Sequence, residues 1–395
     1  MNIKNLFPIF KNRPEITYLD SAATSQKPQR VIDAMSEYYS MNNANIKRGI
    51  YSLAENTTTA YEDVRVKVAS FVNVQPEEIV FTSSATEGVN FIAQAWGSKN
   101  ISAGDEILVT ELEHHSNFLP WQRLVQEKGA ILKIAPIKFD GKLDYEAFSN
   151  LVTPKTKLIA LTAQSNVTGE IVDLKRVVKL AKQIGAKLFV DAAQAIAHKK
   201  MDLKTLNCDF LTFSAHKIFG PTGVGVLFIK KEIQDEVQPY QVGGGMVFEV
   251  GITDSKWLQP PYKFEAGTPP IAQVIGLGAA IDFINANINF DELHKHETSL
   301  SKALVEELQK IDAIKFVADP ELLKGGHVVT FNIKDHHAHD VAAFLDKFGI
   351  CVRAGNHCAQ PLHKALGINS SIRVSFAVYN TMEDVYKLVN AIKKL

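Results

Sequence analysis

KLFVDAAQ at 187–194 and DFLTFSAHK at 209–217 are short apolar runs that each end in polar residues. Both faces of these runs are apolar, as in strands that helices cover on two sides. Five further runs of this kind lie between residues 78 and 230, and amphipathic segments separate several of them. Strands that alternate with helices predict an α/β fold with a mostly parallel, seven-stranded sheet. The expected strands are 78–82, 106–110, 131–135, 157–162, 187–191, 209–213 and 224–230, and the clearest helices are 86–96, 117–128 and 174–184.

The pattern changes after about residue 235. A Gly- and Pro-rich stretch at 241–270 is followed by helix and strand patterns in a different order. They predict a smaller α+β domain. We therefore expect a large α/β domain over 18–265 and a small domain formed by 1–17 and 266–395. The expected helices of the C-terminal part are 271–288, 291–310, 338–348 and 382–394, and its strands are 327–333, 350–353 and 371–376.

Composition excludes several classes of protein. The chain has 395 residues, of which 46% are hydrophobic and 22% charged, as in globular proteins with a sizeable core. Lys+Arg and Asp+Glu are 43 each, so no net charge attracts nucleic acid or an anionic membrane. The longest nearly apolar stretch, 271–284, is too short to span a bilayer. We expect neither a nucleic-acid partner nor a membrane partner.

Cysteine usage indicates the redox compartment. Cys208, Cys351 and Cys358 are too few and too scattered for a disulfide framework. The N-terminus has no apolar region followed by a cleavage site of small residues. We expect a reduced, cytoplasmic protein.

Polar residues follow four of the expected strands. Ligands of such sheets bind beyond the carboxyl ends of the strands. Each group taken singly has an ordinary structural explanation, such as a helix cap or a solvated charge. The groups are Asp191 with Gln194; Ser214, His216 and Lys217; Ser83, Ser84 and Thr86; and His114 with His115.

Together these residues fit a pyridoxal phosphate site. Such a site needs a lysine for a Schiff base and a carboxylate to keep the pyridine nitrogen protonated. It also needs an anion site at a helix N-terminus and a flat group to stack on the ring. Lys217, Asp191, the Ser84–Thr86 turn and His114 supply one of each.

Two other kinds of site are less consistent with the spacing. A metal site would use His114, His115 and Asp191, but adjacent residues on a strand point to opposite faces and no HxH or HExxH spacing is present. A dinucleotide site would need G-x-G-x-x-G between a strand and a helix. The clusters GPTGVG (220–225) and GGG (243–245) lack this spacing, and the first precedes a strand. We expect no metal.

Nine motifs are spread over almost the whole chain. They are YLDSAATSQKP (18–28), RGIYSLA (48–54), ATEGVNFIA (85–93), ELEHHSN (111–117), SNVTGE (165–170), VDAAQ (190–194), SAHKIFGPTGVGVL (214–227), FEAGTPP (264–270) and RAGNHCAQPL (353–362). Together they resemble the motifs of the SufS-type cysteine desulfurases, which belong to the class V aminotransferase group of fold-type I pyridoxal phosphate enzymes. The motifs SAHK and R-x-G-x-H-C-A, in this order and at this spacing, are highly specific.

The resemblance implies a homodimer that converts L-cysteine to L-alanine and leaves sulfur as a persulfide for iron–sulfur cluster assembly. It implies a role for each matching residue. Lys217 would carry the cofactor, Asp191 would pair with the pyridinium, and His114 would stack on the ring and act in proton transfer. Gln194 and Asn166 would lie near the ring oxygen, Asn166 also near the substrate. Phosphate would be bound by Ala85, Thr86, Ser214 and His216, with Thr268 reaching the phosphate of the partner subunit, and Arg373 with Arg353 would bind the substrate.

Cys358 is the expected sulfur acceptor. Its thiolate must attack the substrate sulfur, which requires access and a lowered pKa. Arg353 and His357 are close in sequence, and the Gly355–Asn356 turn predicts an exposed loop. Cys208 and Cys351 each adjoin an apolar strand and are expected to be small buried hydrophobes.

The chain departs from the family pattern at several positions. Lys47 and Tyr51 stand where family members often carry His, Asn356 replaces a His, and Pro270 stands where Asn is usual. None of these changes removes a group that the mechanism requires.

The stretch DHHAHD (335–340) has two interpretations. Its three histidines are a candidate metal site, whereas a solvated turn before a helix is the more ordinary structure. Family members that pass sulfur to the zinc-containing SufU-type acceptor tend to carry a His-Asp pair here, like His339-Asp340. A SufU-type partner is therefore expected, with a SufE-type partner as the alternative.

Two other functions are open at the level of sequence. A selenocysteine lyase shares the fold, the cofactor and most of these residues. A catalytically silent scaffold is a different class, but it would have no physical need for Lys217, Asp191, Arg373 and Cys358 together.

Overall fold

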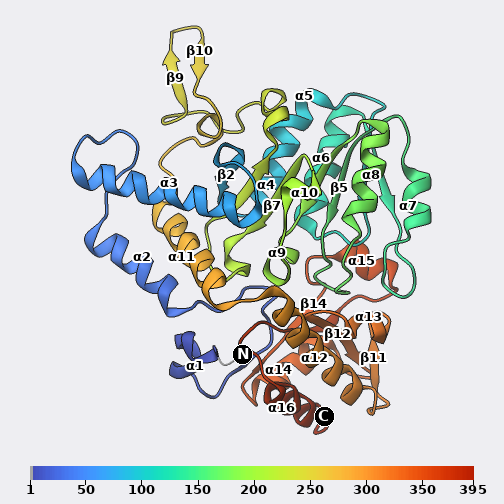
Figure 1. The fold of residues 1–395 in the computed structure, drawn as a ribbon. Coiled ribbons are helices and arrows are strands. Elements are labelled where there is room, and N and C mark those ends of the chain that lie inside the picture. Colours follow the sequence, from blue (N-terminus) through green and yellow to red (C-terminus); the bar gives the residue numbers. More distant parts are fainter. Residues whose placement is uncertain (1–2) are drawn as a thin grey trace.

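A seven-stranded sheet lies at the centre of the structure, a computed structural model that describes residues 3–395 (Figure 1). Its strand order is β2-β8-β7-β6-β5-β3-β4. Strand β8 runs antiparallel to β2 and β7, and the other neighbours are parallel. All seven expected strands are confirmed. Their bounds are β2 Ile79–Thr82, β3 Glu106–Thr110, β4 Ile131–Ala135, β5 Thr156–Thr162, β6 Lys187–Asp191, β7 Phe210–Ser214 and β8 Gly225–Ile229.

Helices cover both faces of this sheet, which explains why its strands are apolar on both sides. Alternate residues of one strand enter different cores: in β6, Phe189 packs with one cluster, and Leu188 and Val190 pack with the other. One face packs against α4 and α6, and the other against α3, α7, α8 and α11. The helices around the sheet are α2 Gln29–Met41, α3 Ser52–Val72, α4 Ala85–Ile92, α5 Ser98–Asn100, α6 Leu119–Lys128, α7 Tyr145–Leu151, α8 Leu174–Ile184, α9 Ala195–His198, α10 Leu203–Leu206 and α11 Ile271–Asn287.

Helix α4 starts directly after β2 and lies close on the sheet. A Cβ atom at Gly88 would come within 2.3 Å of Thr212 Oγ1 on β7. Glycine is therefore required for this close approach. This close packing holds the N-terminus of α4 beside the end of β7, near Lys217.

A second sheet is formed by the C-terminal part of the chain. Its order is β11-β12-β15-β14, and all pairs are antiparallel. Residues from α12, α14 and α16 share a hydrophobic cluster with this sheet. The bounds are α12 Phe290–Leu308, β11 Ile314–Phe316, α13 Pro320–Lys324, β12 Val328–Ile333, α14 Ala338–Asp346, β14 Arg353–Gly355, α15 Gln360–Ala365, β15 Ser371–Ser375 and α16 Met382–Ile392.

The expected strand at 350–353 was wrong as a single element. Strand β13 (Ile350–Cys351) pairs with β1 (Thr17–Tyr18), whereas β14 begins at Arg353 and pairs with β15. At Val352 the chain stops pairing with β1 and begins to pair with β15. This change joins the N-terminal segment to the C-terminal part.

Two further strands lie inside the Gly- and Pro-rich stretch and were not predicted. They are β9 (Val247–Val250) and β10 (Ser255–Trp257), which form an antiparallel hairpin. Figure 1 shows the hairpin projecting away from the rest of the molecule. Its side chains Phe248, Val250 and Ile252 are exposed.

The proposed division into 18–265 against 1–17 with 266–395 stays a prediction. Helix α1 (Pro8–Asn12) follows Phe7, and both Phe7 and α11 contribute to the hydrophobic cluster of the large sheet. Among residues 3–395 no single helix has the length and hydropathy of a membrane span. Helices α11 and α12 reach these values only as a pair that is bent by 85°.

A buried ion pair fixes α3 to the segment that follows the hairpin. Arg65 donates to Glu265 at 2.7 and 3.0 Å and to the carbonyl of Ile79 at 2.8 Å. Glu265 also accepts from the backbone N–H of Phe81 at 2.9 Å. Burial alone would raise the pKa of Glu265, but Arg65 outweighs it and keeps the pKa below its usual value.

We expect Glu265→Ala to lower the free energy of unfolding by about 3–5 kcal/mol, because it removes the buried partner of Arg65 and leaves only the less buried Glu62, 2.8 Å from Nε, to balance its charge. Urea unfolding followed by circular dichroism measures this change. Glu249→Ala is the matched control, since Glu249 pairs with Lys256 on the exposed hairpin and such pairs contribute little. Equal midpoints for the two variants would contradict this account of the pair.

Candidate active site

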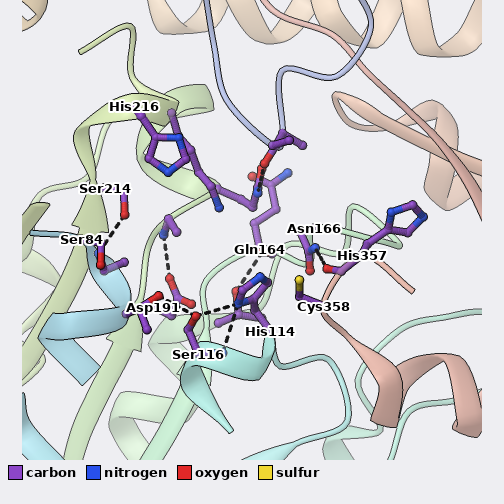
Figure 2. A pocket seen from close by; sticks show the side chains of 18 of the residues that line it. Ser84, His114, Ser116, Gln164, Asn166, Asp191, Ser214, His216, His357 and Cys358 are labelled. Atoms are coloured by element: carbon purple, nitrogen blue, oxygen red, sulfur yellow. Dashed lines mark hydrogen bonds between the residues drawn. The ribbon is translucent and has the colours of Figure 1, made fainter. Parts of the chain in front are cut away.

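One cavity of about 260 Å³ lies at the carboxyl ends of β5, β6 and β7, where the loop before α15 faces them. This size is near the lower end for small-molecule sites. Figure 2 shows the cavity with Cys358 facing His114 and Asn166. Of the predicted site residues, the cavity brings together Lys217, Cys358, His114, Asp191, Gln194, Ala85, Thr86, Asn166, Ser214, His216, Arg353 and Arg373.

Lys217 and Asp191 come from neighbouring parallel strands. Asp191 is the last residue of β6, and Lys217 follows β7 in a short 3₁₀ turn, Ala215–Lys217. Burial lowers the pKa of Lys217 to about 8, although Asp191 acts in the opposite direction. Burial also raises the pKa of Asp191, against the effect of Lys217. Both line the cavity, yet no ion pair within 4.0 Å joins them.

The peptide before the lysine is held by the N-terminal segment. The carbonyl oxygen of His216 accepts from Thr24 Oγ1 at 3.2 Å, from Ser25 N and Ser25 Oγ at 3.0 Å each, and from Lys27 Nζ at 2.9 Å. Ser25 Oγ in turn accepts from Phe219 N at 2.8 Å. These bonds fix the backbone on both sides of Lys217.

The N-terminus of α4 supplies backbone and hydroxyl donors to the cavity. Ser84 is the N-cap residue, and its Oγ accepts from Glu87 N at 3.3 Å. Ala85 N donates to Ser214 Oγ at 2.8 Å, which links α4 to the end of β7. Thr86 Oγ1 lies 2.7 Å from Ser116 Oγ. A helix N-terminus with hydroxyl groups around it favours an anion.

His114 is neutral in this site. Burial, followed by the charge of Lys217, lowers its pKa to about 3. Its Nδ1 accepts from Ser116 N at 3.1 Å, so the ring proton is on Nε2. Burial also lowers the pKa of His216 to about 4. Neither ring adds positive charge to the cavity.

Arg373 lies on β15 and reaches into the cavity from the smaller sheet. Its Nη2 donates to Asp20 Oδ1 at 2.9 Å and its Nη1 to the carbonyl of Asn166 at 3.2 Å. Its Nε is buried and has no acceptor within residues 3–395. A buried donor without a partner costs free energy. This nitrogen therefore keeps an unused hydrogen-bond donor in a side chain that lines the cavity.

Cys358 is placed by a tight turn between β14 and α15. His357 and Cys358 have φ angles of 51° and 57°, a left-handed conformation that is uncommon outside glycine. Asn356 stabilises the turn, because its Oδ1 accepts from Cys358 N at 3.1 Å. Arg353 Nη2 lies 3.7 Å from the sulfur.

Hydrogen bonds tie this turn to the large sheet. Cys358 O accepts from His115 N at 2.7 Å, and His357 O accepts from Asn166 Nδ2 at 2.8 Å. Two expectations are corrected here. The turn is half-buried rather than exposed, because these bonds hold it against the sheet. His357 lends Cys358 no charge, since its ring bonds Ser371 Oγ at 3.0 Å and burial lowers its pKa to about 2.

Thr268 does not reach this cavity. It lines a second cavity of about 410 Å³ with Lys47, Arg48 and Gly245. The expected role of Thr268 concerned the partner subunit, so its place outside the first cavity leaves that prediction open.

Several lining residues were not predicted. They are Ala22, Ala23, Ser116, Thr162, Gln164, Ala193 and His357. Thr162 ends β5 and Gln164 follows it. Ligands of such sheets bind beyond the carboxyl ends of the strands, so β5 could have been used to predict both residues. Ala22 and Ala23 carry no chemical signal, because their position depends on the path of the N-terminal segment.

The histidines of DHHAHD form a helix start, as the more ordinary interpretation expected. His337 is the N-cap residue of α14, and its Nδ1 accepts from His339 N at 3.3 Å. Within residues 3–395, no group of three His, Cys, Asp or Glu side chains is placed to hold a metal ion.

Comparisons with known proteins agree with this geometry. Residues 17–388 match the family model of class-V aminotransferases. A probable cysteine desulfurase of Halalkalibacterium halodurans is 44% identical over 396 residues, which cover 99% of this chain and 97% of that protein. A protein of the same description from Staphylococcus aureus is 44% identical and covers 98% and 94%.

Two solved structures superimpose on almost the whole chain. The apo cysteine desulfurase of Thermococcus onnurineus has a TM-score of 0.95 and 39% identity, with coverage of 99% and 96%. The Escherichia coli cysteine desulfurase CsdA has a TM-score of 0.92 and 36% identity, with the same coverage. Both the fold and the sequence relationship extend over the full length. The chain therefore belongs to the class-V aminotransferase family and, within it, to the cysteine desulfurases.

Proposed function

We propose that this protein is a pyridoxal phosphate-dependent cysteine desulfurase that releases L-alanine from L-cysteine and keeps the sulfur as a persulfide on Cys358. One observation carries the proposal: a single cavity contains Lys217, Asp191 and Cys358, which come from three separate segments. Its relatives described as probable cysteine desulfurases support the same substrate.

The residues present fit the cofactor. Lys217 and Asp191 line one cavity and form no ion pair with each other, so both groups are free to engage a ring bound between them. When bound, pyridoxal phosphate joins an amine through a Schiff base and accepts electrons from the adjacent carbon. Asp191 would hold the ring nitrogen protonated. Gln194 would lie at the ring oxygen, and His114 would cover a ring face.

The phosphate group is proposed to bind at the N-terminus of α4. Ala85 N donates to Ser214 Oγ there, Thr86 Oγ1 contacts Ser116 Oγ, and His216 lines the same cavity. The positive end of the helix favours the anion. No lysine or arginine is needed at this end of the cavity.

Arg373 and Arg353 are proposed to bind the substrate carboxylate. The free Nε of Arg373 is a donor, and Asp20 with Asn166 holds the guanidinium plane in place. A planar fork suits a carboxylate better than an ammonium group does. Asn166, which follows β5 of the large sheet, would contact the substrate from the side of that sheet.

Proton transfer is assigned to Lys217. Because burial lowers its pKa to about 8, about a tenth of Nζ is neutral at pH 7, and this form can accept the Cα proton of the substrate. Neutral His114, with its proton on Nε2, can donate to or take back a proton on the other side of the cavity.

Cys358 is the proposed nucleophile. Its thiolate attacks the substrate sulfur, the Cβ–S bond breaks, and the carbon takes up a proton, so that L-cysteine and a thiol become L-alanine and a persulfide. Arg353 Nη2 lies 3.7 Å from the sulfur of Cys358. The relative turnover of selenocysteine and cysteine distinguishes the proposed cysteine desulfurase from a selenocysteine lyase.

A homodimer is part of the proposal. The hairpin exposes Phe248, Val250 and Ile252, and Thr268 lies in a separate cavity beside Arg48. An exposed apolar hairpin beside a cavity suits contact with a second copy of the chain. Light scattering after gel filtration should give twice the mass of one chain, and the mass of a single chain would contradict a dimer.

We also propose that the sulfur serves iron–sulfur cluster assembly in the cytoplasm and passes to a SufU-type acceptor. His339 Nε2 lies 3.7 Å from the position of a Cβ on Gly355, so the start of α14 borders the cysteine turn. An acceptor bound to α14 would be close to Cys358. Stimulation of turnover by a SufE-type protein alone would contradict this partner, and recovery from a membrane or organelle fraction would contradict the location.

The pKa of Lys217 predicts how the protein takes up its cofactor. The rate at which cofactor-free protein reacts with pyridoxal phosphate should rise with pH, reach half its maximum near pH 8 and level off near pH 9, because the neutral amine reacts. An ordinary lysine would still gain rate up to about pH 10. Visible absorbance measures the rate, and Lys217→Ala should show no such band. A rate that keeps rising beyond pH 9 would contradict the lowered pKa.

Replacement of the proposed nucleophile tests the sulfur step. We expect Cys358→Ser to retain the cofactor absorbance and to lose alanine release from L-cysteine by at least a hundredfold, because no thiol remains to accept the sulfur. Cys351→Ser is the matched control. Cys351 lies on β13 outside the cavity, so alanine release should stay within twofold of the wild type. Retained turnover in Cys358→Ser would overturn the assignment.

A further inference from the structure

A buried histidine lies behind the cavity wall and contacts two of its amides. His327, 1% exposed, precedes β12 in the smaller sheet. It does not line the cavity, whereas Gln194 and Gln164 do. Its backbone carbonyl accepts from Phe376 N at 2.8 Å, so the residue is anchored independently of the site.

The two ring nitrogens of His327 each contact one amide. Nε2 lies 3.3 Å from Gln194 Oε1, and Nδ1 lies 3.3 Å from Gln164 Nε2. Both amides are also bonded elsewhere: Gln194 Nε2 donates to Ala22 O at 2.9 Å, and Gln164 Nε2 to Gly169 O at 3.4 Å. Carbonyl oxygens only accept, so these second bonds fix which end of each amide faces His327.

These contacts allow one protonation state of the ring. Gln194 Oε1 can only accept, so Nε2 carries a proton. Gln164 Nε2 can only donate, so Nδ1 carries a lone pair. The ring is therefore the neutral Nε2–H tautomer.

The surroundings of His327 favour this neutral form. Burial keeps the pKa of His327 well below its usual value, and His198, Arg373 and Lys217 act in the same direction. The ring of His198 stacks on that of His327 with 3.5 Å between centroids. His198 Nδ1 is in turn bonded to Glu297 at 2.9 Å, so this carboxylate binds His198 rather than His327.

We propose that His327 is a positioning residue that holds the Gln194 amide with its N–H group toward the cofactor ring oxygen, and that Gln164 fixes the tautomer that does this. Gln194 Nε2 has two hydrogens, and Ala22 O takes one of them. The second is left for the ring oxygen. The orientation of Gln194 rests on the proposed cofactor, but the tautomer of His327 does not.

The tautomer is measured directly by NMR. In holoenzyme labelled with ¹⁵N-histidine, two-bond proton–nitrogen correlations distinguish Nε2–H, Nδ1–H and the cation. The signals of His327 are those that vanish in His327→Phe. We expect the Nε2–H pattern, unchanged between pH 6 and pH 9. An Nδ1–H pattern, or protonation within this range, would overturn the proposal whatever the cofactor is.

The positioning role is measured by a spectroscopic titration. Without His327 Nε2–H, Gln194 can turn, and the ring oxygen loses a donor to its negative charge. The proton between that oxygen and the Lys217 nitrogen is then held more tightly. We expect His327→Phe to move the pH midpoint of the cofactor's visible absorbance upward by about one unit, as for a charge-assisted hydrogen bond.

Two variants separate positioning from packing. His327→Gln keeps a donor at similar reach and should restore most of the midpoint. His198→Phe changes the stacked ring but touches neither amide, and should leave the midpoint in place. An unchanged midpoint in folded His327→Phe, or an equal shift in His198→Phe, would overturn the role. A wild type without a visible band would instead refute the proposed cofactor, and the tautomer measurement would still decide the hydrogen bonds of His327.

Discussion

A lysine and a carboxylate that face the same cavity without pairing are the constraint on which the site depends. Asp191 ends β6 and Lys217 follows β7, so the parallel pairing of two strands sets their separation. Burial keeps the lysine close to neutrality and favours protonation of the carboxyl group. A cofactor with a basic ring nitrogen and an electrophilic carbon would satisfy both groups at once.

The rest of the structure holds this arrangement in place from two directions. Residues 24–27 place donors on the carbonyl of His216, and the N-terminus of α4 bonds to Ser214 at the end of β7. From the smaller sheet, Arg373 and the Cys358 turn meet the strand ends through Asn166 and His115. The acceptor cysteine is thus held at the site by hydrogen bonds between distant segments. If His327 holds Gln194, the smaller sheet also shapes the cofactor side of the cavity.

Sequence predicted the large sheet because every strand except the edge strand β4 is buried on both faces, and this burial leaves a continuous apolar pattern. It also predicted the cavity lining wherever a polar residue follows a strand, as with Asp191 and Lys217. It missed β9 and β10, because their side chains are exposed and no core pattern marks them. It also misjudged His357, whose neighbour in space is Ser371 rather than Cys358. Proximity along the chain did not predict the direction of that ring. His327 was missed for a related reason, since its contacts join segments that are more than a hundred residues apart.

The most direct test of the account is to locate the sulfur after one turnover. The wild-type holoenzyme is mixed with one equivalent of L-cysteine without reductant, digested, and analysed by mass spectrometry while released alanine is counted. The account predicts one extra sulfur atom on the peptide that contains Cys358, in proportion to the alanine formed. Alanine released with no added sulfur on Cys358, or with the sulfur on Cys351 or Cys208, would contradict it.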